Sequence, residues 1–135
     1  MDLKIYTDGG ALNNPGQAAI AFVIYLDKKL LLKHSEKIGQ TTNNFAEYTA
    51  LLRALDKTKQ LISQQNNIKS VFVFSDSSLM TNQLNGLFKV KNTIIRELIM
   101  KVRVLENEIN IPIIYKNIPR EKNRLADSLV KRILQ

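Results

Sequence analysis

A stretch near the N-terminus, LKIYTDGGALNNPG at residues 3–16, decides how the rest of the chain is interpreted. Its first side chains alternate with the two-residue period of a β-strand. We expect this strand to end at Asp8, ahead of Gly9 and Gly10. A strand-end Asp before two glycines is commonly a turn former, because Asp bonds its own backbone and Gly accepts a positive φ. A chemical role for Asp8 therefore depends on other acids that lie beside it.

Length and composition predict one globular domain, residues 1–135, with an ordinary apolar fraction of 44% and charged fraction of 24%. The sequence has no apolar run long enough for a bilayer and no signal-peptide pattern at its start. It also has no cysteine, which excludes disulfides and thiolate metal sites. We expect a cytoplasmic protein without a membrane partner.

The formal net charge is +8 and the isoelectric point is near 9.8. An excess of Lys and Arg on a small domain favours a polyanionic partner such as nucleic acid. The alternative, a basic protein without such a partner, stays open, because net charge alone does not name a ligand.

Periodicity and turn residues predict the order β-β-β-α-β-α-α-β-α, an α/β fold built on a mixed sheet. A hairpin meander is expected first, and parallel strands joined by helical crossovers follow it. The expected strands are 3–7, 18–26, 30–38, 71–74 and 111–115, and the expected helices start at 44, span 77–85 and 93–108, and follow 119–123.

Two local expectations bear on the site. Asn44 is the predicted N-cap of the first helix, and Glu47 then stands at the capping-box position three residues later. This helix is expected to break at residues 63–67. The wholly apolar run 71–74 predicts a central strand that is buried on both faces.

Four acids fall at the ends of predicted elements: Asp8, Glu47, Asp76 and Asp127. Ligands of open α/β sheets bind outside the carboxyl ends of the strands, so parallel neighbours would bring Asp8 and Asp76 together. Clustered carboxylates repel one another unless cations neutralise them. Oxygen-only ligands favour Mg²⁺, with Mn²⁺ as a substitute. Two such ions could activate a water and stabilise the leaving oxygen in phosphoryl chemistry.

Each acid also has an ordinary structural interpretation. Asp8 could form a turn, Glu47 a capping box and Asp76 an N-cap, and Asp127 could pair with Lys131 one helical turn later. Spacing alone does not show that the four side chains converge.

Four motifs are spread along the chain. They are TDGG at 7–10 with NPG at 14–16, TNNFAEY at 42–48, SDS at 75–77 and REKNRLAD at 120–127. In this order they resemble ribonuclease H of type 1. The resemblance implies a five-stranded mixed sheet flanked by helices. It also implies Mg²⁺-dependent endonucleolytic cleavage of the RNA strand of RNA–DNA hybrids, leaving 3′-hydroxyl and 5′-phosphate ends.

The family's active-site acids match Asp8, Glu47, Asp76 and Asp127. By this resemblance Asp8 bridges two metal ions, Glu47 and Asp76 complete the shell of one ion, and Asp127 assists the other. The expected partner is an RNA–DNA hybrid bound by a monomer, and cleavage of double-stranded RNA stays open.

Substrate contacts are implied at the glycines and amides around these acids. Amide side chains at a helix start can read 2′-hydroxyls, and nearby N–H groups can hold a phosphate. The candidate substrate-binding residues are Gly9, Gly10, Asn14, Thr42, Asn43, Asn44, Ser77, Ser78, Arg120, Lys89 and Lys91.

The chain departs from the family pattern at three places. Ser78 replaces a Gln that touches the substrate in many members. No His precedes the last acid, and Arg120 is the nearest substitute, suited to holding phosphate but not to proton transfer. A short connection with Lys89 and Lys91 stands in place of a Trp-rich basic protrusion.

Two other functions fit parts of this pattern. A non-catalytic binder of hybrid or double-stranded RNA gains nothing from clustered acids beside phosphates. A DNA-acting nuclease of the same superfamily fits the acids, but the amides at Asn43 and Asn44 favour 2′-hydroxyl recognition.

Overall fold

The computed structural model describes residues 1–65 and 67–135. The strands are β1 (Asp2–Ala11), β2 (Gly16–Leu26), β3 (Lys29–Thr41), β4 (Ser70–Ser75) and β5 (Ile113–Asn117). The helices are α1 (Asn43–Gln64), α2 (Ser78–Leu84), α3 (Thr93–Ile109) and α4 (Arg124–Leu134), and a single 3₁₀ turn, η1 (Arg120–Lys122), precedes α4. The predicted order of elements and the α/β class are confirmed.

The five strands form one mixed sheet in the order β3-β2-β1-β4-β5. The first three strands pair antiparallel as a meander. Strand β4 then returns parallel to β1, and β5 parallel to β4. The parallel ladder between β1 and β4 ends at the pair Thr7 and Ser75. The residue that follows this pair is an aspartate on both sides: Asp8 within β1 and Asp76 just after β4.

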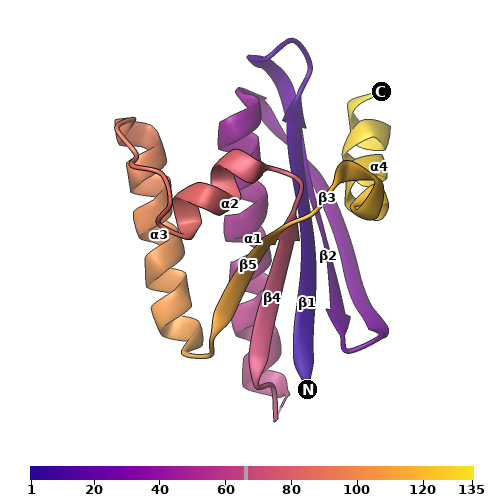
Figure 1. Cartoon of the computed structure of the whole chain (residues 1–135). Coiled ribbons are helices and arrows are strands. Elements are labelled where there is room, and N and C mark those ends of the chain that lie inside the picture. The colour runs from indigo at the N-terminus through magenta and orange to yellow at the C-terminus, as the bar shows by residue number, and fades with distance from the viewer. Residues whose placement is uncertain (66) are drawn as a thin grey trace.

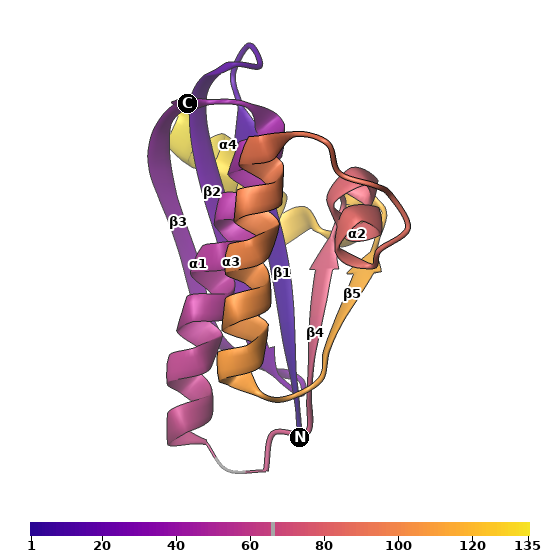
Figure 2. The same ribbon diagram turned by 90° about the vertical axis from the view of Figure 1, so that its left-hand side faces the viewer.

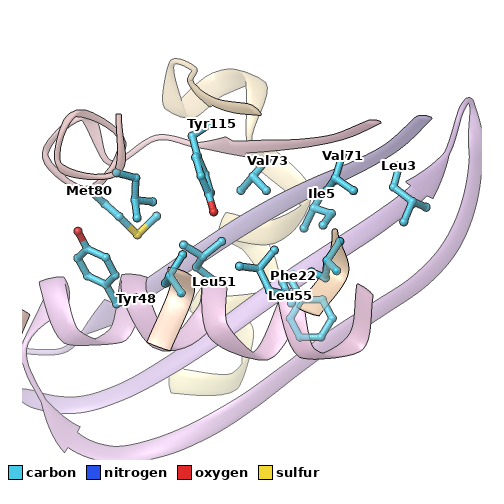
Figure 3. Close-up of a cluster of buried hydrophobic side chains, with 14 of the residues drawn as sticks. Leu3, Ile5, Phe22, Tyr48, Leu51, Leu55, Val71, Val73, Met80 and Tyr115 are labelled. Carbon is cyan, nitrogen blue, oxygen red and sulfur yellow. The ribbon is translucent and has the colours of Figure 1, made fainter. Parts of the chain in front are cut away.

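Helices lie on both faces of this sheet. Helices α1 and α3 lie side by side against one face, and α4 lies on the other, over the β2–β3 side (Figures 1 and 2). The main core fills the space between α1 and the sheet, where Leu51 and Leu55 meet Ile5 and Val73 (Figure 3). The hydroxyl of buried Tyr48 donates to Gln83 on α2 at 2.6 Å. The core contacts hold α1 against the sheet, and the Tyr48 hydrogen bond joins α1 to α2.

The predicted end of the first strand at Asp8 is wrong, and the alternative interpretation of Asp8 as a turn former fails with it. Strand β1 continues through these residues to Ala11, because each of them still pairs with β2, up to the pair Ala11 and Ala18. Asp8 thus lies one residue beyond the parallel pairing with β4 but sits within the antiparallel pairing with β2.

The predicted N-cap of α1 is also wrong. Thr42, not Asn44, caps the helix, because its Oγ1 accepts the N–H of Phe45 at 3.1 Å. Glu47 therefore has no capping-box partner at Asn44. The helix ends at Gln64, within the predicted break at 63–67, of which position 66 lies outside the described residues.

The expectation of a strand buried on both faces fails for β4. Val71 and Val73 are buried, whereas Phe72 and Phe74 on the other face are half-buried, because no helix covers that part of the sheet (Figure 1). Strand β5 starts two residues later than predicted, since Ile113 pairs with Val71.

Among the residues that the structure describes, no helix has the length and apolar character needed to cross a bilayer.

Candidate active site

Asp8 and Asp76 follow the last pair of the β1–β4 ladder, at the carboxyl ends of two neighbouring parallel strands. This is the edge of an open α/β sheet where ligands bind. Asp76 does not cap α2, because Ser77 does so: its Oγ accepts the N–H of Met80 at 3.2 Å. The side chain of Asp76 is thereby left for another role.

Glu47 reaches these aspartates because β1 and α1 touch at a glycine. A Cβ atom at Gly9 would lie 2.5 Å from the backbone carbon and oxygen of Ala46 and 2.7 Å from the nitrogen of Glu47. Only glycine tolerates so close an approach of two backbones. Gly9 therefore sets the distance between Asp8 and Glu47, and it does so without a turn.

Asp8, Glu47 and Asp76 each present one carboxylate oxygen, and these oxygens lie within 4.8 Å of one another. Burial raises the pKa of Asp8 to about 7, and the charges of Asp76 and Asp127 add to this rise. Burial, followed by the charges of Asp8 and Asp76, raises the pKa of Glu47 well above its ordinary value. Without a cation, the three acids cannot all be ionised cheaply at neutral pH.

The donor set fits a divalent metal ion. The buried Oε2 of Glu47 has no hydrogen-bond partner among the described residues, and an orphaned buried oxygen is costly unless something else binds it. Carboxylate oxygens are the ligands that Mg²⁺ and Mn²⁺ prefer. A cation among these side chains would also reverse the repulsion that raises their pKa values.

Asp127 lies at the border of this group. Its carboxylate raises the pKa of Asp8, yet it also pairs with Lys131 at 3.0 Å, as the ordinary interpretation of this residue predicted. Its oxygens do not belong to the set within 4.8 Å that the other three acids form. Arg120 faces the same acids, and its positive charge lowers the pKa of both Asp8 and Glu47.

These acids line one cleft of about 590 Å³ between the ends of β1 and β4, the start of α1 and α4. Most of the predicted substrate residues line it as well. They are Gly9, Gly10, Asn14, Asn43, Asn44, Ser77 and Arg120. The described residues that line the cleft do not include Thr42, Ser78, Lys89 or Lys91.

Two asparagines brace the loop before β2 against the start of α1. Asn14 Oδ1 accepts the N–H of Asn43 at 2.8 Å, and Asn43 Oδ1 accepts the N–H of Ala11 at 2.7 Å. Each side chain thus uses its carbonyl oxygen on the backbone and keeps an NH₂ group with two donors. The two amides can support the loop and still donate into the cleft.

Asn123 was not predicted as a functional residue. It is buried, and its Nδ2 donates to the carbonyl of Thr7 at 2.8 Å and to Asp76 Oδ2 at 3.4 Å. This side chain ties the start of α4 to β1 and orients Asp76. A polar residue just before an apolar helical pattern suggests only an N-cap, so sequence offered no signal for this contact.

We expect Mg²⁺ to stabilise the protein more at pH 8 than at pH 5.5. In metal-free protein the pKa of Asp8 is raised, so its contribution to stability falls as pH climbs from its ordinary value of about 3.9 toward about 7. Metal binding favours the ionised form and offsets this loss. Thermal unfolding with and without Mg²⁺ at both pH values measures the effect.

The matched variant for this measurement is Asp8→Asn, which cannot titrate at this position. Its Mg²⁺-dependent rise in Tm should be small at both pH values. An equal rise for wild type and Asp8→Asn would mean that Mg²⁺ stabilises the protein elsewhere.

Comparisons with known proteins show which family and fold this chain is similar to. A family model described as reverse transcriptase-like matches residues 6–133. A bifunctional protein of Mycobacterium tuberculosis is 34% identical over 131 residues, which cover 96% of this chain and 34% of that protein. Ribonuclease HI of Halobacterium salinarum is 30% identical over 130 residues, which cover 96% of this chain and 62% of that enzyme. The chain thus spans about a third to three fifths of these curated relatives.

A solved structure is similar over nearly its whole length. It is LC11-RNase H1, an enzyme isolated from compost by a metagenomic approach, in complex with an RNA/DNA hybrid. It is 39% identical to this chain, covers 96% of this chain and 94% of its own, and superposes with a TM-score of 0.89.

Proposed function

The chain belongs to the ribonuclease H type 1 family, and from this premise we propose that it hydrolyses the RNA strand of RNA–DNA hybrids. The observation that carries the proposal is the convergence of Asp8, Glu47 and Asp76, whose oxygens lie within 4.8 Å of one another. The hybrid bound to the similar compost enzyme supports the choice of substrate. Residues 1–135 would form one ribonuclease H domain, acting as a monomer in the cytoplasm.

The acids would hold the metal ions of the reaction. Asp8, Glu47 and Asp76 would hold one Mg²⁺ ion, and Asp8 with Asp127 a second, with Mn²⁺ as a substitute. When bound, two such ions acidify a water and stabilise the leaving oxygen of an in-line displacement. The proposed products carry 3′-hydroxyl and 5′-phosphate ends. Asn123 keeps Asp76 aimed at the cleft through its Nδ2 donor.

The polar residues of the cleft would orient the substrate. The NH₂ groups of Asn14 and Asn43 can donate to 2′-hydroxyls, which distinguish RNA from DNA. Asn44 lies beside them at the start of α1. Ser77 Oγ accepts from the backbone at Met80 and still has its own proton to donate.

Other predicted contacts lie at the margins. Thr42 caps α1, so it would act by presenting the helix N-terminus to a phosphate. Lys89 and Lys91 lie in the connection between α2 and α3 and would contact the nucleic-acid backbone outside the cleft. Ser78 is exposed at the first position of α2 and would make at most a marginal contact.

One experiment tests the function. An end-labelled RNA strand is offered paired with DNA, paired with RNA, and alone, in Mg²⁺, in Mn²⁺ and in EDTA. We expect cleavage of the hybrid only with metal present, and the second substrate decides whether double-stranded RNA is also cut. Hybrid binding without cleavage in either metal would contradict the proposal and favour a non-catalytic binding module.

We expect Arg120→Ala to lower hybrid cleavage by roughly tenfold to a hundredfold without abolishing it, the loss typical of one hydrogen bond to a charged group. Arg120 is exposed at the mouth of the cleft, so the fold should be unaffected. Its guanidinium cannot serve as a base, which fits a role in holding phosphate. Steady-state kinetics measure the loss.

The matched control is Arg132→Ala, which removes the same charge from an exposed position of α4. It should cleave at the wild-type rate. Complete inactivity of Arg120→Ala would show that this arginine does more than hold phosphate.

A further inference from the structure

The sheet has a second partly exposed surface, on the face opposite α1 and α3. Helix α4 covers this face over β2 and β3, but no helix lies over β4 (Figure 1). Aromatic side chains of β1, β2 and β4 stand here and are half-buried: Tyr6, Tyr25, Phe72 and Phe74. The face is therefore aromatic, partly open and separate from the main core.

The pairing registers align these rings with lysines in two rows that cross the sheet. The first row is Leu30–Tyr25–Lys4–Phe72–Ile114, and the second is Lys33–Val23–Tyr6–Phe74–Lys116. The rings of Tyr6 and Phe74 stack with centroids 4.8 Å apart, and Tyr25 meets Tyr6 edge-on at 5.8 Å. The ammonium group of Lys116 lies 5.6 Å from the centre of the Phe72 ring. We call this surface the aromatic face.

The aromatic face leads into a hollow of about 380 Å³ below α4. Tyr6 and Tyr25 line this hollow, and four cations surround it: Lys4, Lys28, Lys122 and Arg124. The one acid in its lining, Asp27, already accepts the backbone N–H of Asp2 at 3.0 Å. The volume lies within the range of about 300–1,000 Å³ that small-ligand sites occupy.

This hollow is separate from the catalytic cleft. Among the described residues, none lines both. The two sites meet at η1, where Arg120 lines the cleft and Lys122 lines the hollow. A strand that leaves the cleft across η1 would thus come directly onto the aromatic face.

We propose that the aromatic face binds single-stranded nucleic acid, with bases against the Tyr and Phe rings and phosphates against the lysines. Partly exposed rings interleaved with cations suit sequence-tolerant binding of single strands, because every base has a face that can stack. The bases of a duplex are already stacked on each other, so a duplex cannot use these rings. The occupant is then a single-stranded flank of a hybrid or a released RNA strand.

The test is binding of a fluorescent oligothymidylate of about 12 nucleotides, within the usual range of site sizes, followed by fluorescence anisotropy in EDTA. Two variants probe the two parts of the surface. Tyr6→Leu with Phe74→Leu removes two rings but keeps apolar side chains on the sheet. Lys4→Gln with Lys116→Gln removes two charges from the same rows and leaves the rings in place.

We expect the ring variant to bind at least about tenfold more weakly, the loss of one or more stacked bases. The lysine variant should also bind more weakly. The slope of log affinity against log salt concentration should become less steep by about 1.4, because each of two phosphates that no longer pairs with a lysine contributes roughly 0.7. Lys57→Gln with Lys101→Gln, which removes the same charge from α1 and α3, should bind like wild type.

Three results would overturn the proposal. Wild-type protein could fail to bind the oligonucleotide, or the α1–α3 control could lose as much affinity as the lysine variant. Alternatively, sedimentation could show self-association of the wild type that the ring variant lacks, which would assign the face to a second copy of the chain. Because the assay contains neither metal nor hybrid, its result does not depend on whether the protein cleaves hybrids.

Discussion

Asp76→Asn is expected to lower hybrid cleavage by at least roughly 10²–10³-fold, the loss that follows removal of one preorganised electrostatic group from an active site. The amide keeps the size of the side chain and can still accept from Asn123 Nδ2, so the geometry should survive. What disappears is a charged oxygen within 4.8 Å of those of Asp8 and Glu47. Steady-state cleavage of a labelled hybrid in saturating Mg²⁺ measures the loss.

The same variant should be as stable as wild type in EDTA, or slightly more so. The charge of Asp76 contributes to the raised pKa values of Asp8 and Glu47, which means that it repels them in metal-free protein. Asp56→Asn, an exposed substitution on α1, serves as the control and should alter neither cleavage nor stability. A near-normal cleavage rate for Asp76→Asn would refute the assignment of the metal ligands.

Gly9→Ala is expected to damage both stability and activity, by about 1–3 kcal/mol or more in the free energy of unfolding. The new methyl group would lie 2.5 Å from backbone atoms of Ala46, which cannot rotate away as a side chain can. Strand β1 and helix α1 would have to separate, and Glu47 would move with α1. A displacement of about 1 Å at a reacting centre can cost about 10²-fold in rate.

Gly10→Ala is the matched control for stability. Its Cβ atom would lie 3.8 Å from the Val130 side chain and 4.0 Å from Asn43 Oδ1, ordinary contact distances. Urea unfolding should show a wild-type midpoint for Gly10→Ala and a clear loss for Gly9→Ala. If both variants unfold like wild type, the backbones of β1 and α1 do not constrain each other as the structure indicates.

Local patterns predicted the elements well where one interaction dominates. Alternation, continuous apolar runs and amphipathic spacing identified the five strands and the four α-helices in order, because burial of one or both faces imposes those patterns. They failed where two local solutions were equally good. Asn44 and Thr42 are both suitable N-caps by residue type, and the structure uses Thr42. The N–H of Asn43 donates to Asn14 Oδ1, so the loop before β2 meets the helix at Asn43.

The glycines illustrate a second kind of failure. The Asp8-Gly9-Gly10 sequence suggests a turn, because Gly is the residue that turns require. Here Gly9 is needed because it has no side chain: the backbone of Ala46 occupies the space that a Cβ atom would take. Likewise, the apolar run of β4 suggested burial on both faces, while Phe72 and Phe74 form part of a surface that no helix covers.

By itself, the sequence determined the α/β class and the order of the elements, because these depend on residue types and on local periodicity. It proposed four candidate acids from their places at element ends and from the family resemblance. Only the tertiary structure decided that oxygens of Asp8, Glu47 and Asp76 lie within 4.8 Å of one another, and that Asn123 supports Asp76. It also decided that the aromatic rings of three strands form one surface. The physical reason is that these contacts join residues far apart in the chain, and only the strand register and the close packing of α1 on β1 bring them together.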